Sequence, residues 1–187
     1  MVEIKNISFS YGKNEAVKNI SFDINPGECV GVLGNNGSGK SSIVERIIGR
    51  ENTGITCSGT FRAGSGLVVS YVPQDASFLR GGLSIFAKEH GLDESLFKAL
   101  LRKLDFSREQ FETDMSDFSE GQKKKTLIAK SLCERAHLYV WDEPLNFIDV
   151  FSRVQIEELL LQFAPTILFV EHDGAFCENV GTKRVWL

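Results

Sequence analysis

The octapeptide GNNGSGKS, at residues 34–41, is the feature that most restricts what this chain can form. It matches the pattern G-x-x-x-x-G-K-[ST], follows the apolar run at 28–33 and precedes an amphipathic segment at 41–49. In such a strand, loop and helix, backbone N–H groups and the helix N-terminus face phosphate oxygens. We expect Lys40 to reach the β- and γ-phosphates of a nucleotide, and the Ser41 hydroxyl to bind Mg²⁺. The predicted phosphate-binding residues are Gly34, Asn35, Asn36, Gly37, Ser38, Gly39, Lys40, Ser41 and Ser42.

The size and charge of the chain narrow its class further. Its 187 residues suit one domain with a substantial core, because domains usually have roughly 100–200 residues. Hydrophobic residues make up 42% and charged residues 25%, which excludes disordered, collagen-like and disulfide-stapled classes. The net charge of -4 gives no general attraction to a polyanion. The sequence has no apolar run of about 18 residues and no signal peptide, so we expect a cytoplasmic protein without membrane insertion.

The four cysteines, at positions 29, 57, 133 and 177, lie far apart, and only three histidines accompany them. No spacing typical of a zinc site is present. We expect reduced and mostly buried thiols, as in cytosolic proteins.

The pattern of apolar residues predicts an α/β fold. Residues 2–24 alternate apolar and polar around Gly12, which predicts two antiparallel strands. Continuous apolar runs predict a buried, mostly parallel sheet. Only helical periodicity appears between 73 and 135, which predicts a helical subdomain inserted into one domain, 1–187, whose nucleotide-binding core is 1–72 and 136–187. The parallel strands are predicted at 28–33, 67–72, 137–141 and 166–170, and the helical segments of the insertion at 94–104, 107–114 and 119–136.

Two acidic residues, Asp142 and Glu143, follow the predicted strand at 137–141. Alone, such a pair is most often a solvated turn. When a phosphate-binding loop lies upstream in the sequence, an aspartate at a strand end can bind in the coordination shell of Mg²⁺. The adjacent carboxylate can then polarise the water that attacks the γ-phosphate. We therefore predict Asp142 as a metal ligand and Glu143 as a catalytic residue.

The segment FSEGQ, at 118–122, resembles the signature sequence of ABC ATPases, which usually reads LSGGQ. Together with the phosphate loop, or Walker A motif, the resemblance covers nearly the whole chain in the right order. It implies a P-loop NTPase fold of the ABC type, which binds and hydrolyses ATP with Mg²⁺.

The same resemblance gives roles to isolated residues. Tyr11 in SFSYG is similar to the aromatic residue that stacks on adenine, although an aromatic beside a turn is more often simple packing. Gln74 in YVPQD is similar to the Q-loop glutamine, whose amide reaches Mg²⁺ or the attacking water. His172 in FVEHD is similar to the switch histidine, which hydrogen-bonds the γ-phosphate, whereas a lone histidine is more often structural. Residues 146–149 occupy the D-loop position.

Ser119 has two compatible roles. Its hydroxyl can cap a helix, with Gln122 three residues later completing a capping box. The resemblance implies that Ser119, Gly121 and Gln122 also close over the γ-phosphate bound to a second ABC domain. The active site would then be composite, with half of each site on this chain.

Charged residues occur within this segment and directly after it. Glu120 stands where the family usually has glycine, and it adds negative charge close to the partner's ATP. The triplet Lys123, Lys124 and Lys125 is predicted to be a solvated helix face, with a contact to a nucleic-acid phosphate backbone as the alternative.

The C-terminal part resembles the second nucleotide-binding domain of ABC-F proteins, in particular the branch that protects ribosomes from antibiotics. Members of that family carry two ABC domains on one chain and no membrane domain, which implies a ribosome partner and a chain that is a fragment. Leu145 and Phe147 differ from the T-N-H pattern common in other ABC-F domains.

Two alternatives stay open. The first is the ATPase subunit of a membrane transporter, which should carry a groove near Gln74 for helices of its membrane domain. The second is a nucleotide-binding module that does not hydrolyse ATP, against which Glu143 and His172 argue.

Overall fold

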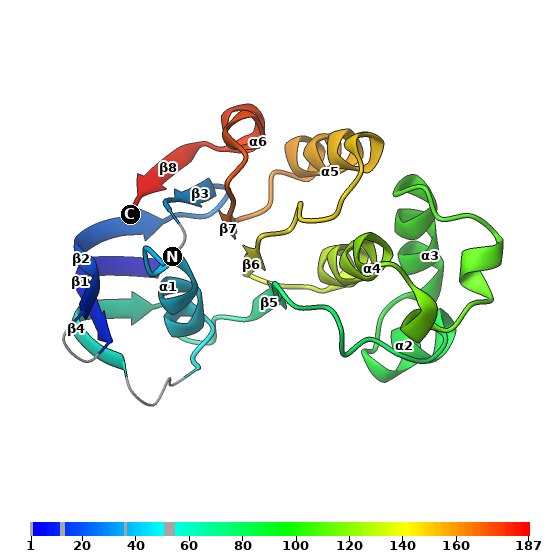
Figure 1. The fold of residues 1–187 in the computed structure, drawn as a ribbon, viewed down its shortest axis with the longest axis horizontal. Coiled ribbons are helices and arrows are strands. Elements are labelled where there is room, and N and C mark those ends of the chain that lie inside the picture. Colours follow the sequence, from blue (N-terminus) through cyan, green and yellow to red (C-terminus); the bar gives the residue numbers. More distant parts are fainter. Residues whose placement is uncertain (1, 12–13, 36, 51–54) are drawn as a thin grey trace. The chain divides into compact units, whose positions relative to one another are not determined.

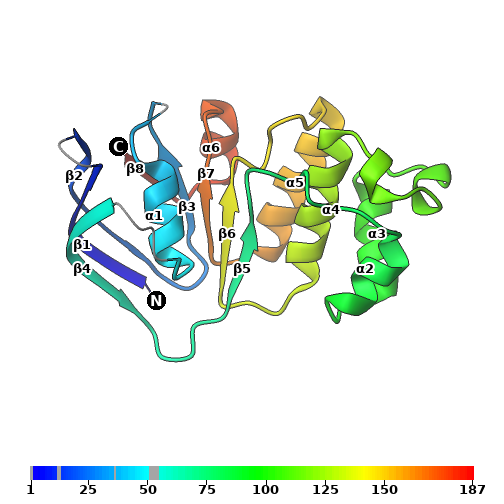
Figure 2. The ribbon, with the colours of Figure 1, turned by 60° about the horizontal axis from the view of Figure 1, so that its bottom comes forward.

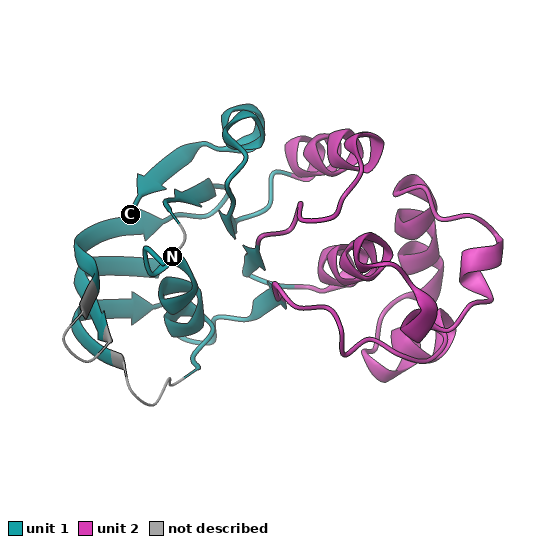
Figure 3. Cartoon of the chain, in the orientation of Figure 1, with its two compact units in different colours: residues 1–71, 136–142, 164–187 teal, residues 72–135, 143–163 magenta. Residues whose placement is uncertain are grey.

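The computed structural model describes residues 2–11, 14–35, 37–50 and 55–187 (Figure 1). The chain forms two compact units, drawn in two colours in Figure 3. Unit 1 comprises residues 1–71, 136–142 and 164–187, and unit 2 comprises 72–135 and 143–163.

Unit 1 begins with an antiparallel sheet of β1 (Val2–Tyr11), β2 (Asn14–Ile24) and β4 (Ile55–Ala63), in the order β2-β1-β4. The antiparallel pairing of β1 with β2 confirms the prediction for the N-terminal strands. Strand β4 was not predicted. Four of its nine residues are Thr, Ser or Arg, so its sequence lacks a clear apolar face, and its pairing with β1 is what defines it as a strand.

The second sheet of unit 1 has five strands in the order β5-β6-β7-β3-β8 (Figure 2). Strand β3 pairs in parallel with β7 and with β8, and β6 pairs in parallel with β7. The mostly parallel core sheet is therefore confirmed, while the short C-terminal strand β8 is an addition. The strands are β3 (Cys29–Leu33), β5 (Val69–Val72), β6 (Leu138–Asp142), β7 (Ile167–Val170) and β8 (Lys183–Trp186).

Two helices complete unit 1. Helix α1 (Lys40–Ile47) lies between the two sheets (Figure 2), where Ile43, Val44 and Ile47 join one core with residues of β1, β2, β3, β6 and β7. Helix α6 (Gly174–Val180) packs on β7 through an edge-on contact of Phe176 with Phe169, whose ring centroids are 5.1 Å apart. These packed layers hold the loop between β3 and α1 at the ends of the strands.

Unit 2 is helical in its described residues and contains α2 (Leu83–Glu89), α3 (Glu94–Lys103), α4 (Glu120–Cys133) and α5 (Val150–Phe163). The helix predicted at 107–114 is wrong, because only a single 3₁₀ turn forms at Glu109–Phe111. There, the Gln110 side chain accepts from the Ser107 backbone N–H at 2.7 Å, and Thr113 donates to the Glu109 carbonyl at 2.9 Å. Such local bonds compete with a continuing helix. A second 3₁₀ turn spans Met115–Asp117.

The four cysteines are free and differ in exposure. Cys29 and Cys177 are buried, and burial raises the pKa of the Cys29 thiol to about 12. Cys57 is exposed, and Cys133 is half-buried. None of the helices in the described ranges has the length and hydropathy needed to cross a bilayer.

Candidate functional site

The loop between β3 and α1 needs glycine at particular positions. All five residues of β3 are buried, and α1 starts at Lys40. Gly39 has φ +87°, and a Cβ on it would lie 2.3 Å from Cγ2 of Val17. A larger residue here would therefore clash with β2 as well as strain its own backbone. Gly37 also lies in the left-handed region, with φ +82°.

Ser38 shows that this loop fits a polar ligand. Its Oγ is buried and has no hydrogen-bond partner among the residues that the structure describes. Its backbone N–H donates to the Asn35 carbonyl at 3.1 Å, and a Cβ on Gly34 would lie 2.6 Å from Ser38 Oγ. A buried hydroxyl without a partner is costly, and a phosphate oxygen would satisfy it.

Lys40 and His172 come together within unit 1. Lys40 is only 6% exposed, and its Nζ donates to the carbonyls of Gly34 at 2.5 Å and Asn35 at 3.4 Å. His172, which follows β7, places Nε2 3.2 Å from the same Nζ. Because an ammonium can only donate, this contact needs Nε2 as the acceptor. The structure thus brings together the predicted phosphate lysine and the predicted switch histidine.

The oxygen donors of unit 1 suit Mg²⁺. Asp142 ends β6 and is buried, while Ser41 is exposed and Ser42 is buried in the first turn of α1. No three His, Cys, Asp or Glu side chains gather into a metal cage within the described ranges. Mg²⁺ needs none, since proteins bind it through one or two carboxylates together with substrate phosphates and water. Burial, followed by the charge of Asp142, raises the pKa of Tyr71 to about 12, so that phenol stays neutral.

In unit 2, two amides hold the carboxylate of Glu143. Gln74 Nε2 donates to Glu143 Oε2 at 2.7 Å, and Asn146 Nδ2 donates to the same oxygen at 2.5 Å. Glu143 itself has φ +47°, a conformation that residues with a side chain seldom adopt. Two predicted catalytic residues, 69 positions apart, are therefore in direct contact. From the sequence, Asn146 was predicted only as part of the D-loop, and its contact with Glu143 was not predicted. The one sequence feature that could have suggested this contact is the spacing of three residues between them.

The N-terminus of α4 carries the predicted capping box. Ser119 Oγ accepts from the Gln122 backbone N–H at 3.3 Å, and Gln122 Oε1 accepts from the Ser119 backbone N–H at 2.8 Å. This confirms the capping prediction. A Cβ on Gly121 would lie 2.4 Å from the carbonyl oxygen of Phe147, so glycine is needed for α4 to approach the 146–149 segment.

The prediction of a solvated face for the lysine triplet is wrong. Lys123, Lys124 and Lys125 are 8%, 1% and 8% exposed. The first pairs with Glu120, and the last with Asp149, whose oxygen is 2.7 Å from Lys125 Nζ. A basic run on a helix is solvated only where no other segment covers it, and here oxygen acceptors of unit 2 surround it.

Asp149 links the lysine triplet to the start of α5. Burial of the carboxyl opposes its ionisation, but the ion pair with Lys125 and the hydrogen bonds from Ser152 hold the pKa of Asp149 well below its usual range. The Ser152 backbone N–H donates to Oδ1 at 2.9 Å, and the Ser152 hydroxyl donates to Oδ2 at 2.8 Å. Asp149 therefore stays charged in the folded chain at neutral pH.

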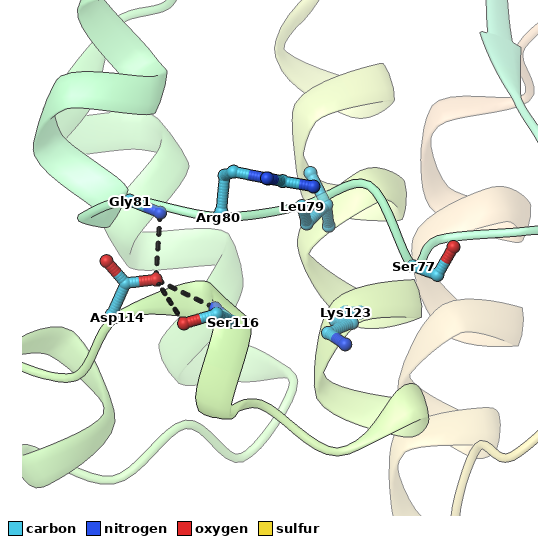
Figure 4. Close-up of a pocket in the computed structure, with 7 residues that line it drawn as sticks. All are labelled: Ser77, Leu79, Arg80, Gly81, Asp114, Ser116 and Lys123. Carbon is cyan, nitrogen blue, oxygen red and sulfur yellow. Dashed lines mark hydrogen bonds between the residues drawn. The ribbon is translucent and has the colours of Figure 1, made fainter.

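Unit 2 also contains a separate pocket of about 460 Å³ (Figure 4). The first of its lining residues in the sequence is Ser77, three residues after Gln74. Asp114 forms one wall, where its Oδ1 accepts from the backbone N–H of Gly81 at 2.9 Å and of Ser116 at 2.8 Å. Arg80 and Lys123 add positive charge (Figure 4). The lining residues are Ser77, Leu79, Arg80, Gly81, Asp114, Ser116 and Lys123.

Two of the predicted nucleotide-binding residues fall outside the part of the chain that the structure describes in full. Asn36 is not among the described residues, and the side chain of Tyr11 is also outside the description, although its backbone belongs to β1.

The fold and the glycine-rich loop define a nucleotide-binding domain of the phosphate-loop class. The chain belongs to the ABC transporter family, whose model matches residues 17–146. A solved dimeric bacterial ABC transporter cassette superposes on 100% of this chain and 94% of that chain, with a TM-score of 0.78 and 18% identity. The ABC ATPase fold is thereby confirmed.

Curated relatives with different roles are about equally similar to the chain. It is 29% identical over 187 residues to the ribosome protection protein VmlR of Bacillus subtilis, covering 98% of this chain and 34% of the relative. It is 28% identical over 202 residues to the manganese transport system ATP-binding protein MntB of B. subtilis, covering 95% of this chain and 79% of the relative. The chain thus spans about a third of the length of VmlR.

Proposed function

We propose that this chain binds ATP with Mg²⁺ and hydrolyses it together with a second ABC domain. The observation that carries the proposal is the glycine-rich loop before α1, where the buried hydroxyl of Ser38 has no hydrogen-bond partner among the described residues and needs a polar oxygen, and where the ammonium of Lys40 adds positive charge. A polyphosphate supplies that oxygen. Membership of the ABC transporter family supports the same assignment.

In this proposal, the backbone of residues 34–39 and the start of α1 bind the phosphates, and Lys40 neutralises their charge. Ser41, Asp142 and Gln74 offer oxygen ligands to Mg²⁺. The metal supplies positive charge that stabilises the phosphate oxygens. The side chain of Tyr11 stacks on the base, a role supported by the family resemblance alone.

Glu143 acts as the general base for the attacking water. Its Oε2 is held by the amides of Gln74 and Asn146, which leaves Oε1 outside these two hydrogen bonds. A fixed carboxylate is the arrangement that positions a water for in-line attack. His172, whose Nε2 lies 3.2 Å from the ammonium of Lys40, stabilises the charge that develops on the γ-phosphate.

The second ABC domain completes the site in this proposal. The N-terminal turn of α4 contains Ser119, Gly121 and Gln122, and the backbone N–H groups of such a turn favour an anion. The backbone N–H groups of Ser119 and Gln122 already have hydrogen-bond partners in the capping box. We propose that this turn closes over the γ-phosphate held by the partner. The solved dimeric ABC transporter cassette supports such pairing.

The test is ATP turnover by the purified chain over a range of protein concentrations. A composite site predicts a slow rate per molecule that rises with concentration, because only paired domains are complete. The rate should disappear when EDTA removes Mg²⁺. A fast rate that is independent of concentration would show that one chain completes its own site.

For the biological role, we propose part of an ABC-F protein that acts on the ribosome in the cytoplasm. The similarity to the ribosome protection protein VmlR over 98% of this chain supports it. In this role, ATP closes two ABC domains into the form that fits the ribosome, and hydrolysis resets them.

The second candidate is the ATP-binding subunit of a membrane transporter. The similarity to MntB favours it. The pocket whose lining includes Ser77, three residues after Gln74 in the sequence, also favours it, since such a subunit needs a groove in this region. Sedimentation of the full-length protein with ribosomes in the presence of ATP would support the first role. Copurification with a membrane permease would support the second.

A further inference from the structure

Lys124 is almost completely buried, with 1% of its surface exposed. Taking an ammonium out of water is costly unless oxygen acceptors surround it. Lys124 Nζ donates to the carbonyl oxygens of Pro73 and Gln74, each at 2.8 Å. These carbonyls belong to the two peptide groups that flank the Cα of Gln74. Lys124 therefore fixes the backbone on both sides of Gln74, and with it the direction of its side chain.

The segment after Gln74 is held as well. The carboxylate of Asp75 accepts from the Ser77 backbone N–H and from the Ser77 hydroxyl, both at 2.9 Å. These bonds are the main reason that the pKa of Asp75 is lowered, and the charge of Lys124 adds to the effect. The bend at Gln74 thus lies between a buried cation and a closed turn.

The side chain that Lys124 directs ends on Glu143. Gln74 Nε2 lies 2.7 Å from Glu143 Oε2, and the amide of Asn146 donates to the same oxygen. Asn146 is only three residues from Glu143 in the sequence, whereas Gln74 reaches it from a segment 69 residues away. Gln74 therefore ties the carboxylate of Glu143 to a distant segment of unit 2.

Lys124 belongs to α4, two residues after Gln122 of the capping box. We propose that Lys124 is a positioning residue, which ties Gln74 and through it Glu143 to the helix that begins at the signature sequence. A displacement of the N-terminal turn of α4 then moves the base through two hydrogen-bonded steps. The inference rests on the proposed function, because that function gives Glu143 and the turn at Ser119 their roles.

The experiment replaces Lys124 by Met, which keeps the length of the side chain and removes the ammonium. In the ¹⁵N-labelled chain, the side-chain amide signals of Gln74, assigned by their loss in Gln74→Ala, should move to the position of a free amide. ATP turnover, measured where domains pair, should fall at least tenfold, while the affinity for ATP stays within twofold. If the Met variant does not fold, Lys124→Gln, which removes the positive charge and shortens the side chain by one atom, carries the same test.

The matched control is Lys130→Met, which removes a lysine from the same helix. Lys130 pairs with Glu134 at the other end of α4, so its loss should change neither the Gln74 signals nor turnover. A double-mutant cycle separates positioning from general support of the fold. If Lys124 acts through Gln74, adding Lys124→Met to Gln74→Ala should lower turnover no further.

Unchanged Gln74 amide signals in Lys124→Met would overturn the inference. An equal fold-loss of turnover in the wild-type and Gln74→Ala backgrounds would overturn it too. A wild-type chain that does not bind ATP contradicts the proposed function instead, and the amide signals still decide whether Lys124 sets the position of Gln74.

Discussion

The ammonium of Lys40 lies 3.2 Å from Nε2 of His172, although 132 residues separate them in the sequence. Lys40 Nζ also donates to the carbonyls of Gly34 and Asn35, which belong to the loop between β3 and α1. The side chain of Lys40 therefore folds back over the loop that precedes it. The histidine sits at the end of the neighbouring strand β7. Charge and imidazole thus meet at the place where the phosphates are proposed to bind.

Lys40→Ala should weaken ATP binding by about 2–3 kcal/mol, because it removes the charge that neutralises phosphate and its hydrogen bonds. Titration with a fluorescent ATP analogue measures the change. Lys5→Ala is the control, since Lys5 is an exposed lysine of β1 that pairs with Glu3. Equal affinity in the wild type and Lys40→Ala would contradict the assignment of the loop.

Glu143→Gln should lower ATP turnover at least a hundredfold and leave ATP affinity unchanged. Glutamine keeps an oxygen that accepts from the amides of Gln74 and Asn146, but it cannot take a proton from water. Steady-state turnover and nucleotide titration report the two effects separately. Glu158→Gln, on the exposed side of α5, should leave both at the wild-type values. A Glu143→Gln variant that retains turnover would exclude this residue as the base.

Ser119→Arg should prevent ATP-dependent pairing while each chain still binds ATP. In the Glu143→Gln background, where ATP persists, the parent should shift towards a dimer, because each γ-phosphate gains bonds from the opposite helix N-terminus. Sedimentation velocity with ATP, with ADP and without nucleotide measures the shift.

Loss of the cap alone could also weaken α4, and Ser119→Ala controls for it. Alanine removes the hydroxyl that accepts from Gln122 without adding bulk, so this variant should still pair. A parent that stays monomeric with ATP, even when a second ABC domain is supplied, would leave the composite site without support.

Asp149→Asn should lower the free energy of unfolding by about 1 kcal/mol at pH 7, since Asp149 is half-exposed and solvent weakens its ion pair with Lys125. Asparagine can still accept from the Ser152 backbone N–H, so the substitution mainly tests the charge. The lowered pKa of Asp149 stabilises the fold above the ordinary aspartate pKa of about 4, and this contribution declines as the pH falls below that value.

Urea unfolding at several pH values measures this difference between wild type and Asp149→Asn. It should shrink steadily below about pH 4. A constant difference down to pH 2 would show that the charge of Asp149 is not what stabilises this contact.

Features that depend on neighbouring residues could be predicted from the sequence. The strand, loop and helix around GNNGSGKS follow from one apolar run, the glycines and one amphipathic segment. The capping box needs only Ser119 and Gln122, three positions apart, because a helix brings those two backbone N–H groups within reach of the side chains. The general α/β class followed from the alternation of apolar strands and helical segments in the same way.

Features that depend on which segments pack together were decided only by the tertiary structure. Strand β4 forms because its backbone pairs with β1, and its own sequence carries a weak pattern. The burial of Lys124 depends on the Pro73 and Gln74 carbonyls, 51 and 50 residues away, and a run of three lysines carries no sign of them. Motifs identified Gln74 and Glu143 separately, whereas the 2.7 Å contact between them exists because the folded backbone brings two distant loops to one place.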